Sequence, residues 1–413
     1  MNLKTKYQYS YFIYPFVVED NKYEKYILKL LKNAKCKIKV FEREKDADLY
    51  SYFLPKIRST LFWTMDMNKE KIEKLNKLDV NMQAKVVASY PCTMFEYDIE
   101  NDIQGKVSTK DIIYFSISKI EVICFNTGVC FLLIKTILDE GAMFEDLLNF
   151  NYKFREVNSS AYDLKKYENI KIQESRLEDI KSIKTIIKEI VGENKTAKDI
   201  NIEEERFITY SYACVGQEYW QDEKTLKLLE KEFYKFAGVY NEKHKADFEN
   251  LVTGTMKIYE KTKSEIYGFT RIGTVLLTSD IGTENYTTLP HQFERQFFYT
   301  YILELYKKIL LNKINSEFSK LDKFTKAQEN YIKFAKDLWI EEITNNNTGI
   351  MLTKNWRELA KSDEIFIKLK NKYDVIYKNS TLVKSEKQVN WILAILVVML
   401  IVNVIGILIK NKM

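Results

Sequence analysis

The chain has 413 residues, of which 46% are hydrophobic and 14% aromatic, so it can build a sizeable core and has room for more than one domain. Its 64 basic and 58 acidic residues give a net charge of +6 but are interspersed along the chain, which argues against a basic stripe that binds nucleic acid. The five cysteines are odd in number and form no C-x-x-C pair, a pattern that predicts reduced core thiols and not a disulfide framework.

Residues 1–158 predict an α/β domain. Apolar and β-branched runs predict strands, and Asn126-Thr127-Gly128 predicts the turn of a hairpin. Apolar residues at three- and four-residue spacing predict helices between these strands. A chain that opens strand-helix-strand-helix is typical of an α/β or α+β fold. The predicted strands are 7–18, 35–42, 84–90, 93–98, 117–125 and 129–137, and the predicted helices are 23–34, 47–62, 69–78 and 143–154.

Residues 159–290 predict the second part of this domain, and residues 291–389 a helical stalk. The second part begins with a polar linker at 159–174 and continues with helices and strands. After Pro290 an apolar stripe runs from Phe293 through Leu310 without glycine or proline, which predicts a long helix that packs against other helices or copies of itself. A monomeric helical bundle is the alternative. Predicted here are helices at 179–191, 222–236, 292–324, 326–343 and from 354 onward, and strands at 206–215 and within 256–279.

Residues 390–413 predict a single transmembrane helix and a short tail. The stretch from Trp391 to Ile409 contains no charged residue, and at 1.5 Å per residue it spans roughly 28 Å, about the thickness of a bilayer's hydrocarbon core. Lysines flank it on both sides. A buried core helix is the alternative. The N-terminal residues show no signal peptide. We therefore expect a single-pass protein of the cell membrane, anchored at its C-terminus, with the bulk of the chain in the cytoplasm.

The small number of histidines and the absence of catalytic motifs argue against an enzyme. There are only two histidines, His244 and His291, so a two-histidine metal site or a Ser-His-Asp triad is nearly excluded. The sequence contains no G-x-x-x-x-G-K-[ST], G-x-G-x-x-G, H-E-x-x-H or G-x-S-x-G motif. We expect no catalytic residues and no certain cofactor.

Two groups of residues remain as candidate functional sites. Lys153, Arg155, Arg206 and Arg271 lie near the predicted ends of strands, where together they could bind a small anionic ligand; surface salt bridges explain each of them as well. Asn403 and Gly406 interrupt the apolar C-terminal stretch. The amide of Asn403 would need a partner inside a bilayer, which favours a helix contact or a pore lining.

The layout of an α/β domain, a helical stalk and a C-terminal membrane helix resembles the CorA-like membrane proteins. The segments Y-S-Y-F-I-Y-P-F near the N-terminus, L-N-F-N-Y-K-F-R (148–155) and W-I-E-E-I-T-N-N-N-T-G (339–349) are similar to those of divergent members. The Gly-Met-Asn motif of the transporters is absent, and only one span is predicted, so the resemblance points to the effectors linked to type III CRISPR antiviral defence. It implies a ring, most often a pentamer, and a nucleotide-type messenger or Mg²⁺ as ligand.

We therefore predict an oligomeric pore in the lipid bilayer, gated when the cytosolic domain binds a small anionic, nucleotide-like ligand. One alternative is a CorA-like transporter of magnesium or other divalent cations. The other is a tail-anchored scaffold or interaction protein that forms no pore. The predicted partners are the lipid bilayer, further copies of the chain and a small anionic ligand, with no direct contact to nucleic acid.

Overall fold

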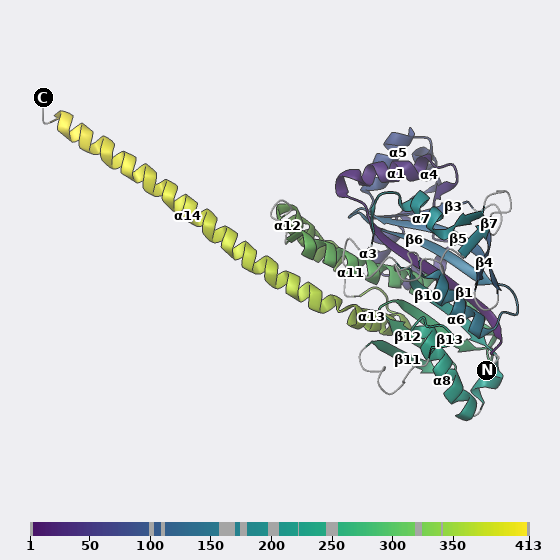
Figure 1. Cartoon of the computed structure of the whole chain (residues 1–413). Coiled ribbons are helices and arrows are strands. Elements are labelled where there is room, and N and C mark those ends of the chain that lie inside the picture. The colour runs from purple at the N-terminus through teal and green to yellow at the C-terminus, as the bar shows by residue number, and fades with distance from the viewer. Residues whose placement is uncertain are drawn as a thin grey trace.

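The computed structural model shows a body built on one large β-sheet, from which a single long helix projects (Figure 1). The structure describes residues 3–98, 103–108, 112–156, 170–173, 180–196, 206–221, 223–244, 255–318, 324–339 and 342–410.

A 13-stranded sheet runs through the whole body in the order β11-β12-β13-β10-β1-β6-β5-β4-β7-β8. Strands β2 and β3 extend from β5, and β9 pairs with β1. Neighbouring strands are antiparallel except β10 and β13, which are parallel. The strands are β1 (Thr5–Val17), β2 (Cys36–Ile38), β3 (Cys92–Tyr97), β4 (Ile103–Ser108), β5 (Ile112–Phe125), β6 (Val129–Leu138), β7 (Ile170–Gln173), β8 (Ile180–Ser182), β9 (Lys195–Thr196), β10 (Ile208–Val215), β11 (Met256–Thr262), β12 (Glu265–Thr270) and β13 (Gly273–Ser279).

Strand β1 lies at the centre of the sheet and divides two hydrophobic cores between its faces. Successive side chains of a strand point to opposite faces. Accordingly, Tyr9 and Tyr11 enter one core, whereas Phe12 and Tyr14 enter the other. Because both faces are covered, nearly every side chain of β1 is buried. This explains why the strand reads as a continuous run of aromatic residues.

The helices are divided between the two faces. The first core takes α2 (Ala47–Tyr52), α3 (Pro55–Leu61), α11 (Phe298–Phe318), α12 (Phe324–Lys333) and α13 (Asn347–Ala360). The second takes α1 (Tyr23–Lys32), α5 (Val80–Ser89), α6 (Phe144–Phe154), α7 (Ile183–Val191) and α8 (Glu223–Ala237). Further helical segments are α4 (Lys69–Asn76), α10 (Thr288–Gln292), α14 (Ser362–Lys410) and the short turns η1 (Asp20–Lys22), η2 (Trp63–Asp66), η4 (Gln217–Trp220), η5 (Thr283–Asn285), η6 (Phe293–Phe297) and η8 (Phe334–Leu338).

Most predicted elements of the first 158 residues are confirmed, including the β5–β6 hairpin, where Gly128 has a φ of 83°. That left-handed conformation favours glycine, and a Cβ there would collide with the carbonyl oxygen of Val18. Two predictions are wrong. The predicted strand at 84–90 lies in the helix α5, and the single helix at 47–62 is split by Pro55, which begins α3.

The predicted fold class is wrong in its helical part. The predicted stalk helix at 292–324 does not project from the body, because α11 packs along the sheet and nearly all of its side chains are buried. Its apolar stripe therefore serves the core of the body and not the contact between copies. Of the long helices that the structure describes, α14 is the one that leaves the body (Figure 1).

The predicted transmembrane helix and membrane localisation are also corrected. Within the described residues, no helix combines the length and the apolar character that a membrane crossing requires. The apolar stretch is the end of α14, a continuous helix of 49 residues whose first half carries many charged residues.

Candidate functional site

The sheet and α11 meet at η6, a π-helical turn that enters α11. A π turn has one more residue than an α turn, so its carbonyl groups do not all find partners in the helix. Tyrosines of the sheet supply donors here. The hydroxyl of Tyr9 donates to the carbonyl of Pro290 at 2.8 Å, and that of Tyr210 donates to the carbonyl of Phe293 at 2.8 Å. The sheet thus holds the entrance of α11 in place.

Glu294 of η6, itself half-buried, is the centre of a group of charges. Its carboxylate lies 2.8 Å from the Nζ of Lys135 and 3.5 Å from the Nζ of Lys119, and it accepts a hydrogen bond of 2.8 Å from the hydroxyl of Tyr11. Burial alone would raise the pKa of Glu294, but Lys135 and Lys119 outweigh it and lower that pKa to about 2. Glu294 is therefore a half-buried anion.

Within the Glu294–Lys135 pair, the surroundings favour the charged form of Glu294 but disfavour the charged form of Lys135. Burial lowers the pKa of Lys135 below its ordinary value, and the attraction of Glu294 does not fully offset that effect. The ammonium also lies 4.8 Å from the ring centre of Tyr9, a cation–π contact that compensates part of its lost hydration. Lys135 thus depends on Glu294 to carry its charge inside the body.

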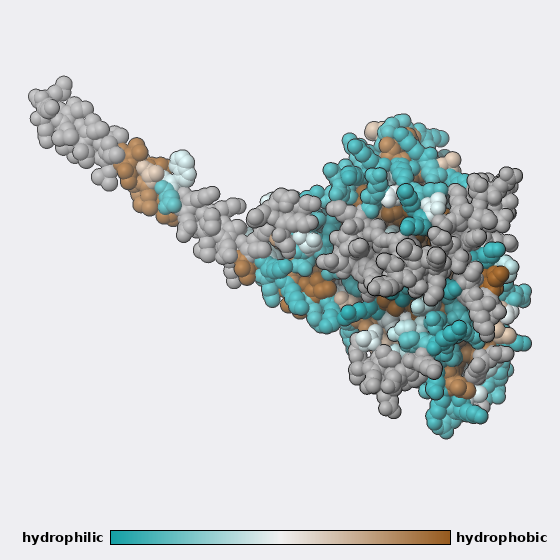
Figure 2. Space-filling view, viewed as in Figure 1, coloured by the Kyte–Doolittle hydropathy of each residue, from teal (hydrophilic) through white to brown (hydrophobic). Residues whose placement is uncertain are grey.

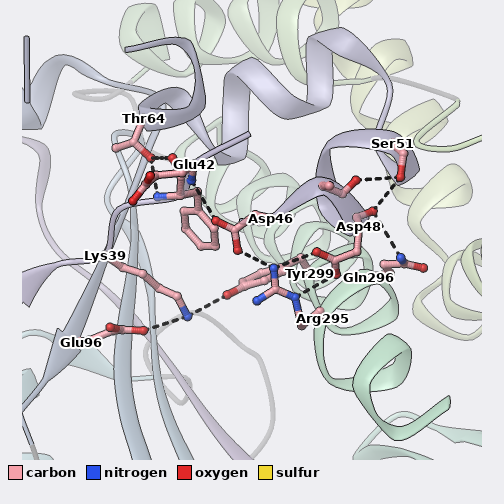
Figure 3. Close-up of polar contacts among 12 residues, drawn as sticks. Lys39, Glu42, Asp46, Asp48, Ser51, Thr64, Glu96, Arg295, Gln296 and Tyr299 are labelled. Carbon is pink, nitrogen blue, oxygen red and sulfur yellow. Dashed lines mark hydrogen bonds and ion pairs between the residues drawn. The ribbon is translucent and has the colours of Figure 1, made fainter. Parts of the chain in front are cut away.

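A second cluster surrounds Lys39, which follows β2 (Figure 3). Its Nζ lies 3.0 Å from Glu96, contacts the buried Glu121 and donates to the hydroxyl of Tyr299 on α11 at 3.1 Å. Burial opposes the charge of Lys39, but Tyr299, Glu121 and Glu96 raise its pKa well above the ordinary value. The pKa of Glu121 is lowered, because Lys39 and Lys119 outweigh its burial.

Arg295 of η6 completes this layer of charges (Figure 3). Its guanidinium binds Asp48 of α2 through two nitrogens, at 2.9 and 3.0 Å, and Asp46 at 2.5 Å. Burial disfavours this charge, yet the two aspartates raise the pKa of Arg295 above its ordinary value. A bidentate contact of this kind fixes the orientation of the guanidinium and compensates its charge. It fastens η6 to the segment that leads into α2.

We call the residues Lys39, Glu96, Glu121, Lys119, Lys135, Glu294, Arg295, Asp46 and Asp48 the charged layer. Each of these side chains has an opposite charge within 4 Å, so the charges of the layer are paired with one another. Such an arrangement holds the sheet, the α2 segment and the start of α11 in one register. It offers no uncompensated acid or base to a substrate. Among the described residues, no group of three or more His, Cys, Asp or Glu side chains could hold a metal ion.

A smaller charged cluster lies in the first half of α11, where this helix faces α13. Glu304 accepts hydrogen bonds from the fully buried Lys307 at 2.8 Å and from the Nε of Arg357 on α13 at 3.1 Å. Burial lowers the pKa of Lys307, despite the attraction of Glu304. Arg357 also borders a hollow of about 420 Å³ that reaches Asp363 in the first turn of α14. Glu304 therefore ties α11 to α13, the helix that precedes α14.

The first turns of the long helix α14, which we call its root, pack against the body, whereas the described side chains farther out are exposed. Phe366, Leu369 and Tyr373 pack against the body, and Phe366 stacks on Trp339 at 4.2 Å between ring centres. Farther out the helix stands clear of the body, and a hydrophobic surface follows (Figures 1 and 2). The large apolar side chains from Trp391 to Met399 are 49–73% exposed. Nine consecutive residues cover every side of a helix, so this segment has no polar face.

The predicted ligand-binding residues gather at one end of two parallel strands. Glu156 bridges to Arg206 just before β10, and the amide of Phe207 donates to the carbonyl of Arg155 at 2.9 Å, which brings Arg155 and Lys153 to the same place. Arg206 already pairs with Glu156 at 3.1 Å. Arg271 precedes β13 and, in the register of Thr209 with Gly273, lies at the same end of the sheet.

Asn403 and Gly406 lie in the last part of α14, where the side chains are outside the described residues. Their predicted role in a pore depended on the membrane span and is not carried further. The charged layer was missed by the sequence analysis. Its signal is visible afterwards: Lys119 and Glu121 are the two charges of β5, and Lys135 is the one charge of the apolar strand β6.

Comparison with known proteins identifies no relative. No protein-family model, no curated protein and no solved structure matches this chain. The resemblance to CorA-like proteins, and the pentameric ring, nucleotide messenger and magnesium that it implies, therefore stay predictions.

Proposed function

We propose that the protein is a non-enzymatic interaction protein that assembles with copies of itself through α14. The observation that carries this proposal is the bare apolar segment from Trp391 to Met399 at the end of a helix that leaves the body. Burying one such side chain is worth roughly 1.5–3 kcal/mol, so its exposure to water is strongly unfavourable. The body cannot cover this segment because the helix carries it away from the sheet (Figure 1).

The α14 helices of further copies of the chain are the partners that the geometry supports best for burying this apolar segment. The stripe that docks the root of α14 consists of Phe366, Leu369 and Tyr373, spaced by three and four residues as in helix-helix seams. The outer segment lies on the same helix, beyond this stripe. A segment that is apolar on every side is not covered by one neighbour, so we expect at least three chains.

The test is the mass of the full chain, measured by light scattering after size-exclusion chromatography, for Ile392→Glu and Ile367→Glu. Both isoleucines are exposed on α14, at 57% and 56%, but only Ile392 lies in the bare segment. We expect the unchanged chain and the Ile367→Glu control to have the mass of three or more copies. Ile392→Glu should shift the chain toward monomer, because a buried carboxylate costs several kcal/mol.

A spin label gives an independent readout of the same assembly. All five native cysteines are buried, so a single cysteine at the exposed Val389 can be labelled selectively. Copies joined through α14 in parallel should give one narrow distance between labels. A monomeric unchanged chain, or equal masses for the two variants, would overturn the proposal.

A second candidate function, binding of a small anionic ligand, is favoured by the gathering of Lys153, Arg155, Arg206 and Arg271 at one end of β10 and β13. Titration calorimetry of the full chain with ATP as the probe tests it. Arg271→Ala should weaken binding about tenfold, or 1.4 kcal/mol, whereas Lys263→Ala, at the exposed β11–β12 turn, should not. Equal affinities for the two variants, or no heat of binding with the unchanged chain, would reject this candidate.

A further inference from the structure

The strand β2 has one edge without a neighbouring strand in the described part of the chain. It pairs only with β3. The carbonyl of Lys35 and the amide of Lys39 both point to the β3 side, in hydrogen bonds of 2.6 Å with the amide of Asp98 and 2.8 Å with the carbonyl of Met94. Hydrogen-bonding groups alternate along a strand, so those of Ile38 point the other way. An unpaired edge of this kind is a template for another strand.

A hollow lined by both apolar and polar side chains lies along this edge. It has a volume of about 380 Å³, and Ile38 and Val40 of the strand segment face Trp63, Ile72 and other side chains across it. The indole of Trp63 stacks on Tyr90 at 3.8 Å between ring centres, which fixes one wall. Val40 is 40% exposed although it is apolar. The full lining is Leu31, Cys36, Lys37, Ile38, Val40, Trp63, Thr64, Ile72, Leu75, Asn76 and Gln83.

A second, wider hollow continues from the first. It has a volume of about 770 Å³ and shares Val40 and Ile72 with its neighbour, so the two form one groove between the 36–44 segment and α4. Four carboxylates line it, those of Glu42, Glu44, Asp66 and Glu73, against the two cations Arg43 and Lys69.

The acidic excess of the second hollow is not neutralised inside the molecule. Arg43 pairs with Asp66 at 2.8 Å, and Glu42 pairs with Lys45 at 2.5 Å. Glu44 and Glu73 are exposed, and within the described residues neither has an ion pair. A ligand that covers this hollow is therefore favoured if it brings positive charge.

We propose that this groove binds an extended segment of a partner protein that adds a strand to β2, with an apolar side chain in the first hollow and lysine or arginine in the second. Main-chain hydrogen bonds to Ile38 and Val40 would supply affinity, and the two hollows would supply specificity. The basic side chains would meet Glu44 and Glu73. This inference does not depend on α14 or on the assembly of copies.

The experiment is a selection of displayed random decapeptides on the full chain, with a Glu44→Lys/Glu73→Lys chain as the decoy. Both carboxylates are exposed, so the decoy should fold, and circular dichroism checks this. We expect the enriched peptides to share an apolar residue followed by lysine or arginine, and to bind the decoy at least tenfold more weakly. Glu70→Lys, on the same helix but outside the groove, is the matched control and should bind as the unchanged chain does.

Two further measurements separate strand addition from simple charge attraction. Methylating alternate backbone amides of an enriched peptide should abolish binding in one alternation and spare it in the other, because only every second amide faces β2. Hydrogen exchange at Ile38 and Val40 should slow when the peptide binds. Peptides that bind the unchanged chain and decoy equally, or that tolerate both methylation patterns, would overturn the proposal. So would protection of these amides that rises with protein concentration alone, since a second copy would then be the occupant.

Discussion

Replacing Glu294 by glutamine is expected to lower the free energy of unfolding by about 3–5 kcal/mol at pH 7, because the change leaves the buried Lys135 without its counter-ion. The amide keeps an acceptor for the hydroxyl of Tyr11, so the loss is mainly one of charge. Urea unfolding of the full chain measures it. Glu284→Gln, on the exposed η5, is the control and should change stability by less than about 0.5 kcal/mol.

The same carboxylate predicts how stability depends on pH. Its pKa is about 2 in the folded chain, against an ordinary value of 4.5, so folding favours the ionised form. The stabilisation is complete above pH 4.5 and is lost as the pH falls toward 2, in total about 3 kcal/mol. The difference in unfolding free energy between the unchanged chain and Glu294→Gln should therefore shrink over this interval. A difference that stays constant with pH would show that Glu294 does not carry this charge.

The sequence could predict elements whose pattern is local. The β5–β6 hairpin was found because Asn126-Thr127-Gly128 separates two apolar runs. The helix α5 was missed because its β-branched residues resemble a strand. Asp79 overrides that preference: it caps the helix through the amides of Asn81 and Met82, and the helix then buries Ala84 and Val87 on one side.

The role of α11 and the charged layer could not be predicted, because both depend on distant partners. A stripe such as Phe293, Phe297 and Tyr301 has the same spacing whether it meets another copy or the sheet of its own chain. In the structure, Phe293 stacks on Tyr210 of β10, so the stripe packs against the sheet of its own chain. Likewise, Lys39, Lys135 and Glu294 are too far apart in sequence for any local pattern to join them.

Glu304 offers the second large effect, because two cations depend on it. Glu304→Gln should destabilise the chain by about 3–5 kcal/mol, since the fully buried Lys307 then loses the carboxylate that it contacts at 2.8 Å. The second cation, Arg357, lies 13% exposed over the ring of Trp339 and borders a hollow, so it can turn toward water. Most of the loss should therefore come from Lys307.

A double variant separates the cost of leaving Lys307 without Glu304 from the value of the ion pair itself. Removing both charges, as Glu304→Leu with Lys307→Met, should restore most of the stability lost in Glu304→Gln, because apolar side chains of similar size carry no cost of lost hydration. If the double variant were as unstable as the single one, the pair would be worth more than its burial costs. Hydrogen exchange at residues 362–373 adds a second readout. Because Glu304 holds α13, which leads through Lys361 into α14, exchange at this root should quicken in Glu304→Gln and recover in the double variant.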